Sequence, residues 1–260
     1  MALRVNVTSR VVAICNQQAG VGKTTTTIRL GVALLERGRR VLLVDLDHEG
    51  SLTVACGIDP AGLSFTIYDV LCGKAAIEEI IMVEVLYKAT GLDVAPANMD
   101  LAAAELELVN TIHREKVLRT ILEPLRARYD YMFIDCPSSL GLLTLNAMVA
   151  ADSLLIPVQR EYPTLRGLDL LCQTCERMKR HNRGLTILGI LPCLHDRRSL
   201  QAREVMRRML ELYPDWVMKP IRSSSRFAES SLAGSGILDH VTKLPGAEAY
   251  RRLAELIDHA

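Results

Sequence analysis

The sequence has few aromatic residues and almost no net charge. Phenylalanine, tyrosine and tryptophan make up 4% of the 260 residues, and 31 basic and 30 acidic side chains leave a formal net charge of +1. A chain this evenly charged has no overall electrostatic preference for nucleic acid or membrane, so any such surface must come from local clustering. No apolar run approaches the roughly 20 residues that a membrane-spanning helix needs.

The sequence also lacks the marks of a secreted, disulfide-bonded protein. Residues Met1 to Arg10 are mixed and polar and contain no apolar core followed by a cleavage site. The seven cysteines are irregularly spaced and lie mostly in apolar runs, which is typical of core residues in a reducing compartment. Cys172 and Cys175 form a single C-x-x-C in a helical pattern, and we expect them to pack, because no second pair completes a tetrahedral metal site. We therefore expect a soluble, cytoplasmic protein.

Short apolar runs alternate with longer helical patterns along the chain. Strands are predicted at Val11 to Cys15, Val41 to Val44, Leu92 to Ala95, Tyr131 to Ile134, Leu154 to Val158 and Leu185 to Leu191. Helices are predicted at Thr25 to Arg37, Ile67 to Leu71, Ala76 to Ile81, Leu101 to Val109, Glu115 to Arg128, Leu142 to Val149, Leu165 to His181 and Leu200 to Leu212. Residues 216–260 are expected to hold a short strand, a Ser-rich turn and a closing helix from Ala247.

This alternation predicts a doubly wound α/β fold, with a mostly parallel sheet and helices on both faces. The chain is 49% hydrophobic and contains no repeat, low-complexity tract or linker. A chain of this size can bury one large core, so we expect a single domain over residues 1–260.

The most informative stretch joins the first predicted strand to the first predicted helix. Gly20 and Gly22 can adopt backbone angles closed to other residues, so the N–H groups can point at phosphate oxygens beside a helix N-terminus. Lys23 would then reach the β- and γ-phosphates of ATP, and the Thr24 hydroxyl would bind Mg²⁺. The expected nucleotide contacts are Gln18, Ala19, Gly20, Val21, Gly22, Lys23, Thr24 and Thr25.

Acidic residues follow two other predicted strands. Asp45 and Asp47 end the second strand, and Asp135 ends the strand from Tyr131 to Ile134. Each aspartate alone can be a residue that caps the next turn. A glycine loop, a D-x-D and a strand-end Asp-Cys-Pro, each after a buried strand, rarely occur together by chance. The combination therefore predicts an ATP site with carboxylates near Mg²⁺ and the attacking water.

These motifs resemble the ParA/Soj branch of the ParA/MinD ATPases, which position DNA or other cargo inside bacteria. The resemblance covers nearly the whole chain and includes the segments 15–27, 135–137, 141–147, 150–152, 156–159 and 246–250. It implies slow ATP hydrolysis to ADP and phosphate, with Asp47 orienting the water and Lys23 as a second catalytic residue. It also implies that Thr24, Asp47 and Asp135 form the Mg²⁺ site.

The chain departs from the family pattern at Gln18, where the family has its signature lysine, and at Ala19, where it has a glycine. In the family this lysine touches the phosphates of the partner subunit. A neutral amide can hydrogen-bond but cannot neutralise charge on the transferring phosphoryl group. We expect slower hydrolysis, a weaker ATP-dependent dimer, or a substitute cation such as Arg160 or Arg166. The alternative is that Gln18 is neutral drift and another residue does this work.

Basic residues gather in the C-terminal third. Arg198 and Arg226 match positions at which ParA-like dimers hold DNA without sequence preference, and Arg222 is a further candidate. For Arg203, Arg207 and Arg208, at helical spacing, a solvated helix face is the simpler interpretation. Phosphate contacts of this kind weaken steeply with salt.

The resemblance implies an ATP-dependent homodimer on nucleoid DNA that serves plasmid or chromosome partition. A ParB-like protein or another cargo adaptor would trigger hydrolysis, and no membrane would be involved. One alternative is a nucleotide-gated regulator or scaffold with little turnover. A MinD-like membrane switch is another, and it would need an amphipathic C-terminal helix with an apolar face.

Overall fold

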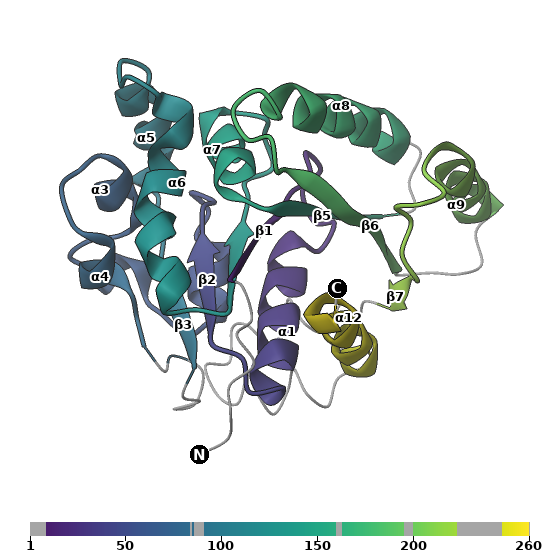
Figure 1. Cartoon of the computed structure of the whole chain (residues 1–260), viewed down its shortest axis with the longest axis horizontal. Coiled ribbons are helices and arrows are strands. Elements are labelled where there is room, and N and C mark those ends of the chain that lie inside the picture. Colours follow the sequence, from purple (N-terminus) through teal and green to yellow (C-terminus); the bar gives the residue numbers. More distant parts are fainter. Residues whose placement is uncertain are drawn as a thin grey trace.

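The structure is a computed structural model that describes residues 9–83, 85, 91–159, 163–194, 200–222 and 246–259. In these residues seven strands form a sheet in the order β3-β2-β4-β1-β5-β6-β7, and each neighbouring pair is parallel (Figure 1). The strands are β1 (Arg10–Ile14), β2 (Val41–Asp45), β3 (Leu92–Ala95), β4 (Tyr131–Asp135), β5 (Ser153–Val158), β6 (Thr186–Leu194) and β7 (Ile221–Arg222). The predicted α/β class with a parallel sheet is confirmed.

Helices cover both faces of the sheet, because successive strand residues point to opposite sides. On β1, Val11 and Ala13 belong to one core cluster, and Val12 and Ile14 belong to the other. The first cluster includes α3 (Ile67–Leu71), α4 (Ile77–Ile80), α5 (Leu101–Leu108), α6 (Val117–Leu122), α7 (Leu142–Ala150), α8 (Pro163–Met178) and α9 (Leu200–Leu212). The second includes α1 (Lys23–Glu36), α2 (Ser51–Ala55) and α12 (Ala247–His259), and Figure 1 shows α1 and α12 side by side.

The predicted helix from Glu115 to Arg128 is wrong as one element. The structure has a 3₁₀ turn η2 (Arg114–Lys116), then α6, then a second 3₁₀ segment η3 (Glu123–Ala127). Pro124 explains the second break, because proline lacks the N–H for a helical hydrogen bond and its ring opposes the preceding turn.

Other boundaries differ by a few residues. The first helix begins at Lys23 rather than Thr25, and the short α2 was not predicted. The remaining 3₁₀ turn is η1 (Pro60–Gly62). The short late strand appears as β7, and the closing helix begins at Ala247 as predicted. The Ser-rich turn lies outside the described residues.

The strand order brings three strand ends together. β4 lies between β2 and β1, and in register Asp135 is paired with Asp45 on one side and with Ile14 on the other. The loop that leaves β1 therefore begins beside the two strands that end in aspartate. In doubly wound sheets, ligands bind at this carboxyl edge.

Candidate nucleotide-binding site

The loop between β1 and α1 has the backbone form that its glycines allow. Gly20 has a φ of 73° and Gly22 a φ of 96°, both in the region that favours glycine. At Gly22 a Cβ atom would meet only ordinary contacts with Cys193, so conformation rather than space requires the glycine. α1 begins at the next residue, Lys23, and its N-terminus therefore points into the loop.

Side chains from the loop itself and from the end of β5 hold this loop in place. Asn16 Nδ2 donates to the carbonyl oxygen of Pro157 at 2.7 Å, and Asn16 Oδ1 accepts from the Gln18 N–H at 2.9 Å. Gln159 Nε2 donates to the carbonyl oxygen of Gly20 at 2.6 Å. These hydrogen bonds fix the loop to the end of the neighbouring strand β5.

Lys23 is buried at the base of the loop. Its ammonium group donates to Ser138 Oγ at 2.6 Å and lies 3.4 Å from the carbonyl oxygen of Gln18. Both partners are neutral, so the positive charge is not cancelled by these two hydrogen bonds. A buried ammonium group held in this way can donate hydrogen bonds to a phosphate and pair with its negative charge.

Asp135 is the last residue of β4, and it lies close enough to Lys23 for the lysine charge to lower its pKa. Its side chain is buried, and Thr27 Oγ1 lies 3.4 Å from its Oδ1. Among the described residues its Oδ2 accepts no hydrogen bond. Burial first and the charge of Asp45 second raise the pKa of Asp135 to about 8, against a hydrogen bond from Thr24 that lowers it. A buried carboxylate oxygen beside a threonine hydroxyl fits Mg²⁺, which prefers such hard oxygen ligands.

The two aspartates after β2 have different surroundings. Asp45 Oδ2 accepts hydrogen bonds from the backbone N–H and the hydroxyl of Thr53, at 2.9 and 2.7 Å. Burial raises the pKa of Asp45 to about 6, although the Thr53 bonds act in the opposite direction. Asp47 accepts from the Glu49 N–H at 3.1 Å, and His48 Nδ1 lies 3.6 Å from the same oxygen. Asp45 therefore anchors the turn between β2 and α2 through Thr53, whereas Asp47 lies within that turn.

The other loop residues of the predicted site differ in exposure. Val21 is buried, Gln18, Thr24 and Thr25 are half-buried, and Ala19 is exposed. The structure therefore brings Lys23, Thr24, Asp47 and Asp135 to one edge of the sheet.

Arg198 and Arg226 lie outside the described residues, as does Arg160, and Arg222 is described only as the last residue of β7. Arg166 is exposed on α8. On α9, Arg207 and Arg208 both pair with Glu204, so they form the ion-paired helix face that was the simpler interpretation.

Known proteins match the chain over nearly its whole length. A protein-family model described as an AAA domain matches residues 9–187. The sporulation initiation inhibitor protein Soj of Bacillus subtilis is 43% identical over 251 residues, which is 95% of this chain and 97% of Soj. The chromosome partitioning protein ParA of Caulobacter vibrioides is 41% identical over 249 residues, which is 94% of this chain and 92% of that protein.

The chain belongs to the ParA/Soj family of P-loop ATPases. A solved structure of the cobyrinic acid a,c-diamide synthase of Mycobacterium smegmatis, with bound ADP and magnesium, has a TM-score of 0.82 and 36% identity. The match covers 96% of this chain and 95% of that one. The same fold therefore holds a magnesium nucleotide in a relative of this ParA/Soj family member.

Residues without a predicted role also contribute to this ParA/Soj-type site. Ser138, Gln159, Thr27 and Thr53 hold Lys23, the loop, Asp135 and Asp45 respectively. Thr27 and Gln159 lie inside segments that were noted in the sequence, and Ser138 directly follows the noted Asp-Cys-Pro, which was the available signal. Thr53 carries no such signal, because its role depends on the turn after β2. Among the described residues, no helix has the length and apolar character needed to cross a membrane.

Proposed function

We propose that this chain is a ParA-type ATPase that binds ATP and Mg²⁺ at the carboxyl edge of its sheet. The observation that supports this most is the meeting of Lys23, Asp47 and Asp135 at one edge, in a chain of the ParA/Soj family. Each residue alone has a structural explanation. Together they supply the cation, the metal-binding carboxylate and the water-positioning carboxylate of a phosphoryl-transfer site.

The roles follow from the geometry of each side chain. The loop N–H groups, including those of Gly20 and Gly22, bind phosphate oxygens, and the Lys23 ammonium exchanges Ser138 for the β- and γ-phosphates. Thr24, Asp135 and Asp47 would hold Mg²⁺ through their oxygen atoms. Mg²⁺, when bound, neutralises charge on the phosphates. Asp47 orients the attacking water.

The proposed biological activity is the positioning of DNA or another cargo. In this proposal the ATP-bound chain forms a homodimer, the dimer binds nucleoid DNA through Arg198, Arg222 and Arg226, and a ParB-like or cargo adaptor stimulates hydrolysis. The support comes from the similarity to Soj and to a chromosome partitioning ParA. The cellular role would then be plasmid or chromosome partition in the cytoplasm.

The main experiment measures DNA binding and ATP turnover in the same samples. The purified protein is titrated with a labelled DNA duplex in the presence of ADP, ATP or a non-hydrolysable analogue, at two salt concentrations. We expect binding only with ATP or the analogue, and weaker binding at higher salt because phosphate contacts release counterions. Charge-removal variants Arg198→Ala and Arg226→Ala should weaken binding, whereas Arg252→Ala, on the exposed face of α12, should not.

Gln18 provides a sharper test of the catalytic proposal. In the native chain this half-buried residue donates its backbone N–H to Asn16, and its side chain carries no charge. Gln18→Lys adds a cation beside the phosphates, so we expect ATP turnover to rise by about tenfold or more. Gln17→Lys, one residue earlier, is the control. An unchanged rate in Gln18→Lys would mean that Gln18 causes no defect.

A second candidate function is a nucleotide-gated protein-binding module with little turnover. The neutral Gln18 favours it, because a site without the signature lysine can still use ATP as a conformational ligand. If DNA binding is absent in every nucleotide state while ATP still binds, this second function replaces the first.

A further inference from the structure

The segment between β4 and α7, residues 136–141, supplies Lys23 with a hydrogen-bond partner from outside the phosphate-binding loop. Lys23 Nζ lies 2.6 Å from Ser138 Oγ and 3.4 Å from the carbonyl oxygen of Gln18, so the serine bond is the shorter. Ser138 is exposed, whereas Lys23 is buried. Within residues 16–25 Lys23 is the only basic side chain. The loop therefore offers a phosphate one ammonium group with three N–H donors.

The backbone on both sides of Ser138 is held by hydrogen bonds. Before the serine, Cys136 donates its N–H to the carbonyl oxygen of Ile14 in β1 at 3.2 Å. After the serine, Thr144 Oγ1 in α7 donates to the carbonyl oxygen of Ser139 at 2.6 Å. The serine hydroxyl therefore stays within reach of the ammonium group and can bind it again after a nucleotide leaves.

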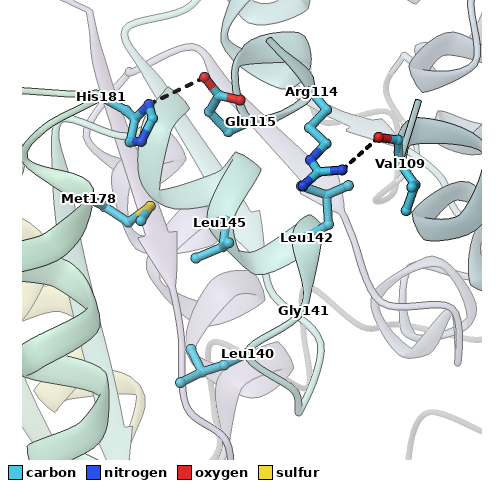
Figure 2. A pocket seen from close by; sticks show the side chains of 9 residues that line it. All are labelled: Val109, Arg114, Glu115, Leu140, Gly141, Leu142, Leu145, Met178 and His181. Carbon is cyan, nitrogen blue, oxygen red and sulfur yellow. Dashed lines mark hydrogen bonds and ion pairs between the residues drawn. The ribbon is translucent and has the colours of Figure 1, made fainter. Parts of the chain in front are cut away.

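Beyond the serine, the same segment borders a hollow of about 440 Å³ between η2, α7 and the end of α8 (Figure 2). Leu140 and Gly141 line this hollow, whereas none of the loop residues 16–25 does. Closely packed side chains resist displacement, and an open space does not. Because Ser138 is itself exposed, its side chain can turn away from the ammonium group without compressing the core, and the residues after it have room to follow.

The three donors of the Lys23 ammonium group limit how many partners it can keep. With ADP the acceptors are the Gln18 carbonyl, the Ser138 hydroxyl and a β-phosphate oxygen, so each donor has one partner. With ATP a γ-phosphate oxygen becomes a fourth acceptor, and one of the two neutral acceptors is displaced because phosphate oxygens carry charge. Release of Ser138 is the less unfavourable, since its exposed hydroxyl can bind water, whereas a half-buried Gln18 carbonyl would lose a donor.

We propose that Ser138 determines how strongly this site distinguishes ATP from ADP, because its hydroxyl competes with the γ-phosphate for Lys23. ADP leaves the hydrogen bond between Lys23 and Ser138 intact, whereas ATP breaks it. The serine therefore lowers the affinity for ATP relative to the affinity for ADP. It acts through Lys23 and takes no part in the bond that hydrolysis breaks. The inference rests on the proposed function, since it names the residue by which the same site separates its two nucleotides.

The test compares two affinities of the full-length protein by titration calorimetry with Mg²⁺, one for ADP and one for a non-hydrolysable ATP analogue. Ser138→Ala removes the competing hydroxyl. We expect its affinity for the ATP analogue to rise by about threefold to tenfold, the range that one net hydrogen bond gives. Its affinity for ADP should stay within about twofold of the native value, because ADP does not compete with the hydroxyl.

Two matched variants separate the effect of the hydroxyl from that of the segment. Ser138→Thr keeps a hydroxyl on the same Cβ atom, so it should retain the native ratio of the two affinities. Ser139→Ala removes the neighbouring exposed hydroxyl, which forms no hydrogen bond with the residues that the structure describes. It should therefore leave the ratio unchanged as well.

Three results with Ser138→Ala would overturn this inference while leaving the proposed function in place. An unchanged ratio of the two affinities would mean that the hydroxyl does not compete with the γ-phosphate. Equal losses of both affinities would mean that the serine only positions Lys23. A loss for the ATP analogue alone would mean that the hydroxyl donates to the γ-phosphate. A native protein that binds neither nucleotide would overturn the proposed function and this inference together.

Discussion

The two ends of the central sheet place buried carboxylates in opposite environments. At the carboxyl ends, Asp45 and Asp135 are buried and form no ion pair with the described residues, and burial raises their pKa values to about 6 and about 8. At the amino ends, the side chain of Asp258 is only 2% exposed, yet its pKa is lowered. Burial alone would raise it, but hydrogen bonds from Arg39 and Arg37 outweigh burial.

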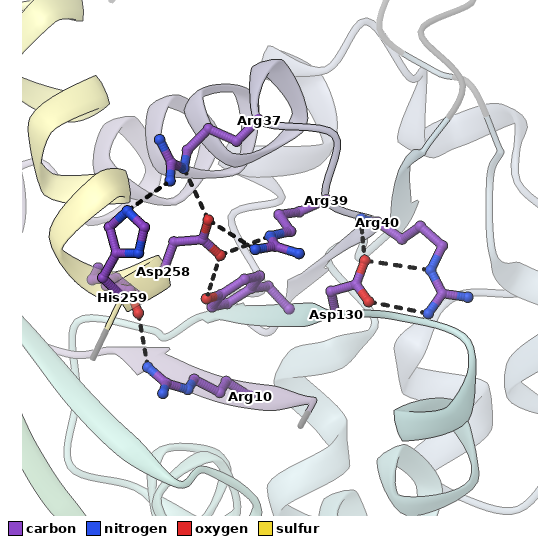
Figure 3. Close-up of polar contacts among 9 residues, drawn as sticks. Arg10, Arg37, Arg39, Arg40, Asp130, Asp258 and His259 are labelled. Carbon is purple, nitrogen blue, oxygen red and sulfur yellow. Dashed lines mark hydrogen bonds and ion pairs between the residues drawn. The ribbon is translucent and has the colours of Figure 1, made fainter. Parts of the chain in front are cut away.

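Figure 3 shows the carboxylates at the amino end of the sheet paired with arginine side chains. Asp258, near the end of α12, lies 2.7 Å from Arg39 Nε and 3.0 Å from Arg37 Nε, and it accepts the Tyr131 hydroxyl at 3.1 Å. This network ties the last helix to the turn before β2 and to the start of β4. Carboxylates paired with arginines therefore hold elements together at the amino end, whereas the buried carboxylates without an ion-pair partner at the carboxyl end are the ones proposed to bind Mg²⁺.

The largest expected effect is on ATP turnover, when Asp135 at the carboxyl end of the sheet is neutralised. Asp135→Asn keeps the shape of the side chain but removes its negative charge, so we expect ATP turnover to fall by about 100-fold or more. The Mg²⁺-dependent gain in affinity for an ADP analogue should disappear with it. Phosphate release and nucleotide titration with and without Mg²⁺ measure both, and Asp130→Asn at the amino end is the control. If ATP turnover of Asp135→Asn stays within about threefold of the native value, the charge of Asp135 is not needed for catalysis.

An aspartate-to-asparagine substitution at the amino end of the sheet, at Asp258, should lower the free energy of unfolding rather than ATP turnover. Asp258→Asn leaves Arg37 and Arg39 without their carboxylate, and because the side chains of both arginines are partly exposed, at 30% and 25%, we expect a cost of about 1–2 kcal/mol of unfolding free energy. Urea unfolding measures this, with turnover per folded molecule expected to stay constant. Glu255→Gln, on the exposed face of the same helix, is the control. If Asp258→Asn unfolds at the native urea concentration, the pairing does not stabilise α12.

The pH dependence of stability should have opposite signs at the two ends. Asp135 has a folded-state pKa of about 8 against an ordinary value of 3.8, so the folded metal-free protein keeps a proton that the unfolded chain has released. The folded protein therefore loses stability as the pH rises from about 3.8 to about 8, and Asp135→Asn should remove this loss.

Thermal midpoints in chelator should show the stabilising effect of Asp135→Asn growing from about pH 5 to about pH 8. For Asp258 the pKa is lowered, so its contribution is present above the ordinary value of 3.8 and is lost as pH falls below it. An Asp135→Asn protein with the same midpoint shift at every pH would show that Asp135 is ionised normally.

The smallest effect on stability is expected on α9, away from both ends of the sheet. Glu204 on α9 is fully exposed, and hydrogen bonds from Arg207 and Arg208 lower its pKa to about 2. Exposed pairs contribute little to stability, because water screens them and ordering the long side chains is unfavourable. Glu204→Gln should therefore shift the thermal midpoint by less than about 1 °C. A shift as large as that of Asp258→Asn would remove the distinction between buried and exposed pairs.

The loop and the strand-end aspartates could be predicted because each is a local pattern. Gly20, Gly22 and Lys23 are nearly consecutive, and Asp135 follows an apolar run directly. The partners of these residues could not be predicted in the same way. Gln159 reaches the Gly20 carbonyl, and Ser138 reaches Lys23, only because β1 lies between β4 and β5 in the sheet. Strand order depends on packing over the whole chain rather than on neighbouring residues.

The sequence by itself determined the parallel α/β class, the phosphate-binding loop and the ParA/Soj family, because these depend on periodicity and on short motifs. The tertiary structure decided which charges are compensated. Asp135 and Asp258 both follow apolar patterns in the sequence, yet among the described residues Asp135 forms no ion pair, whereas Asp258 lies between two arginines. Burial and distance set the free energy of a charge, and both arise only when the strands and α12 are assembled.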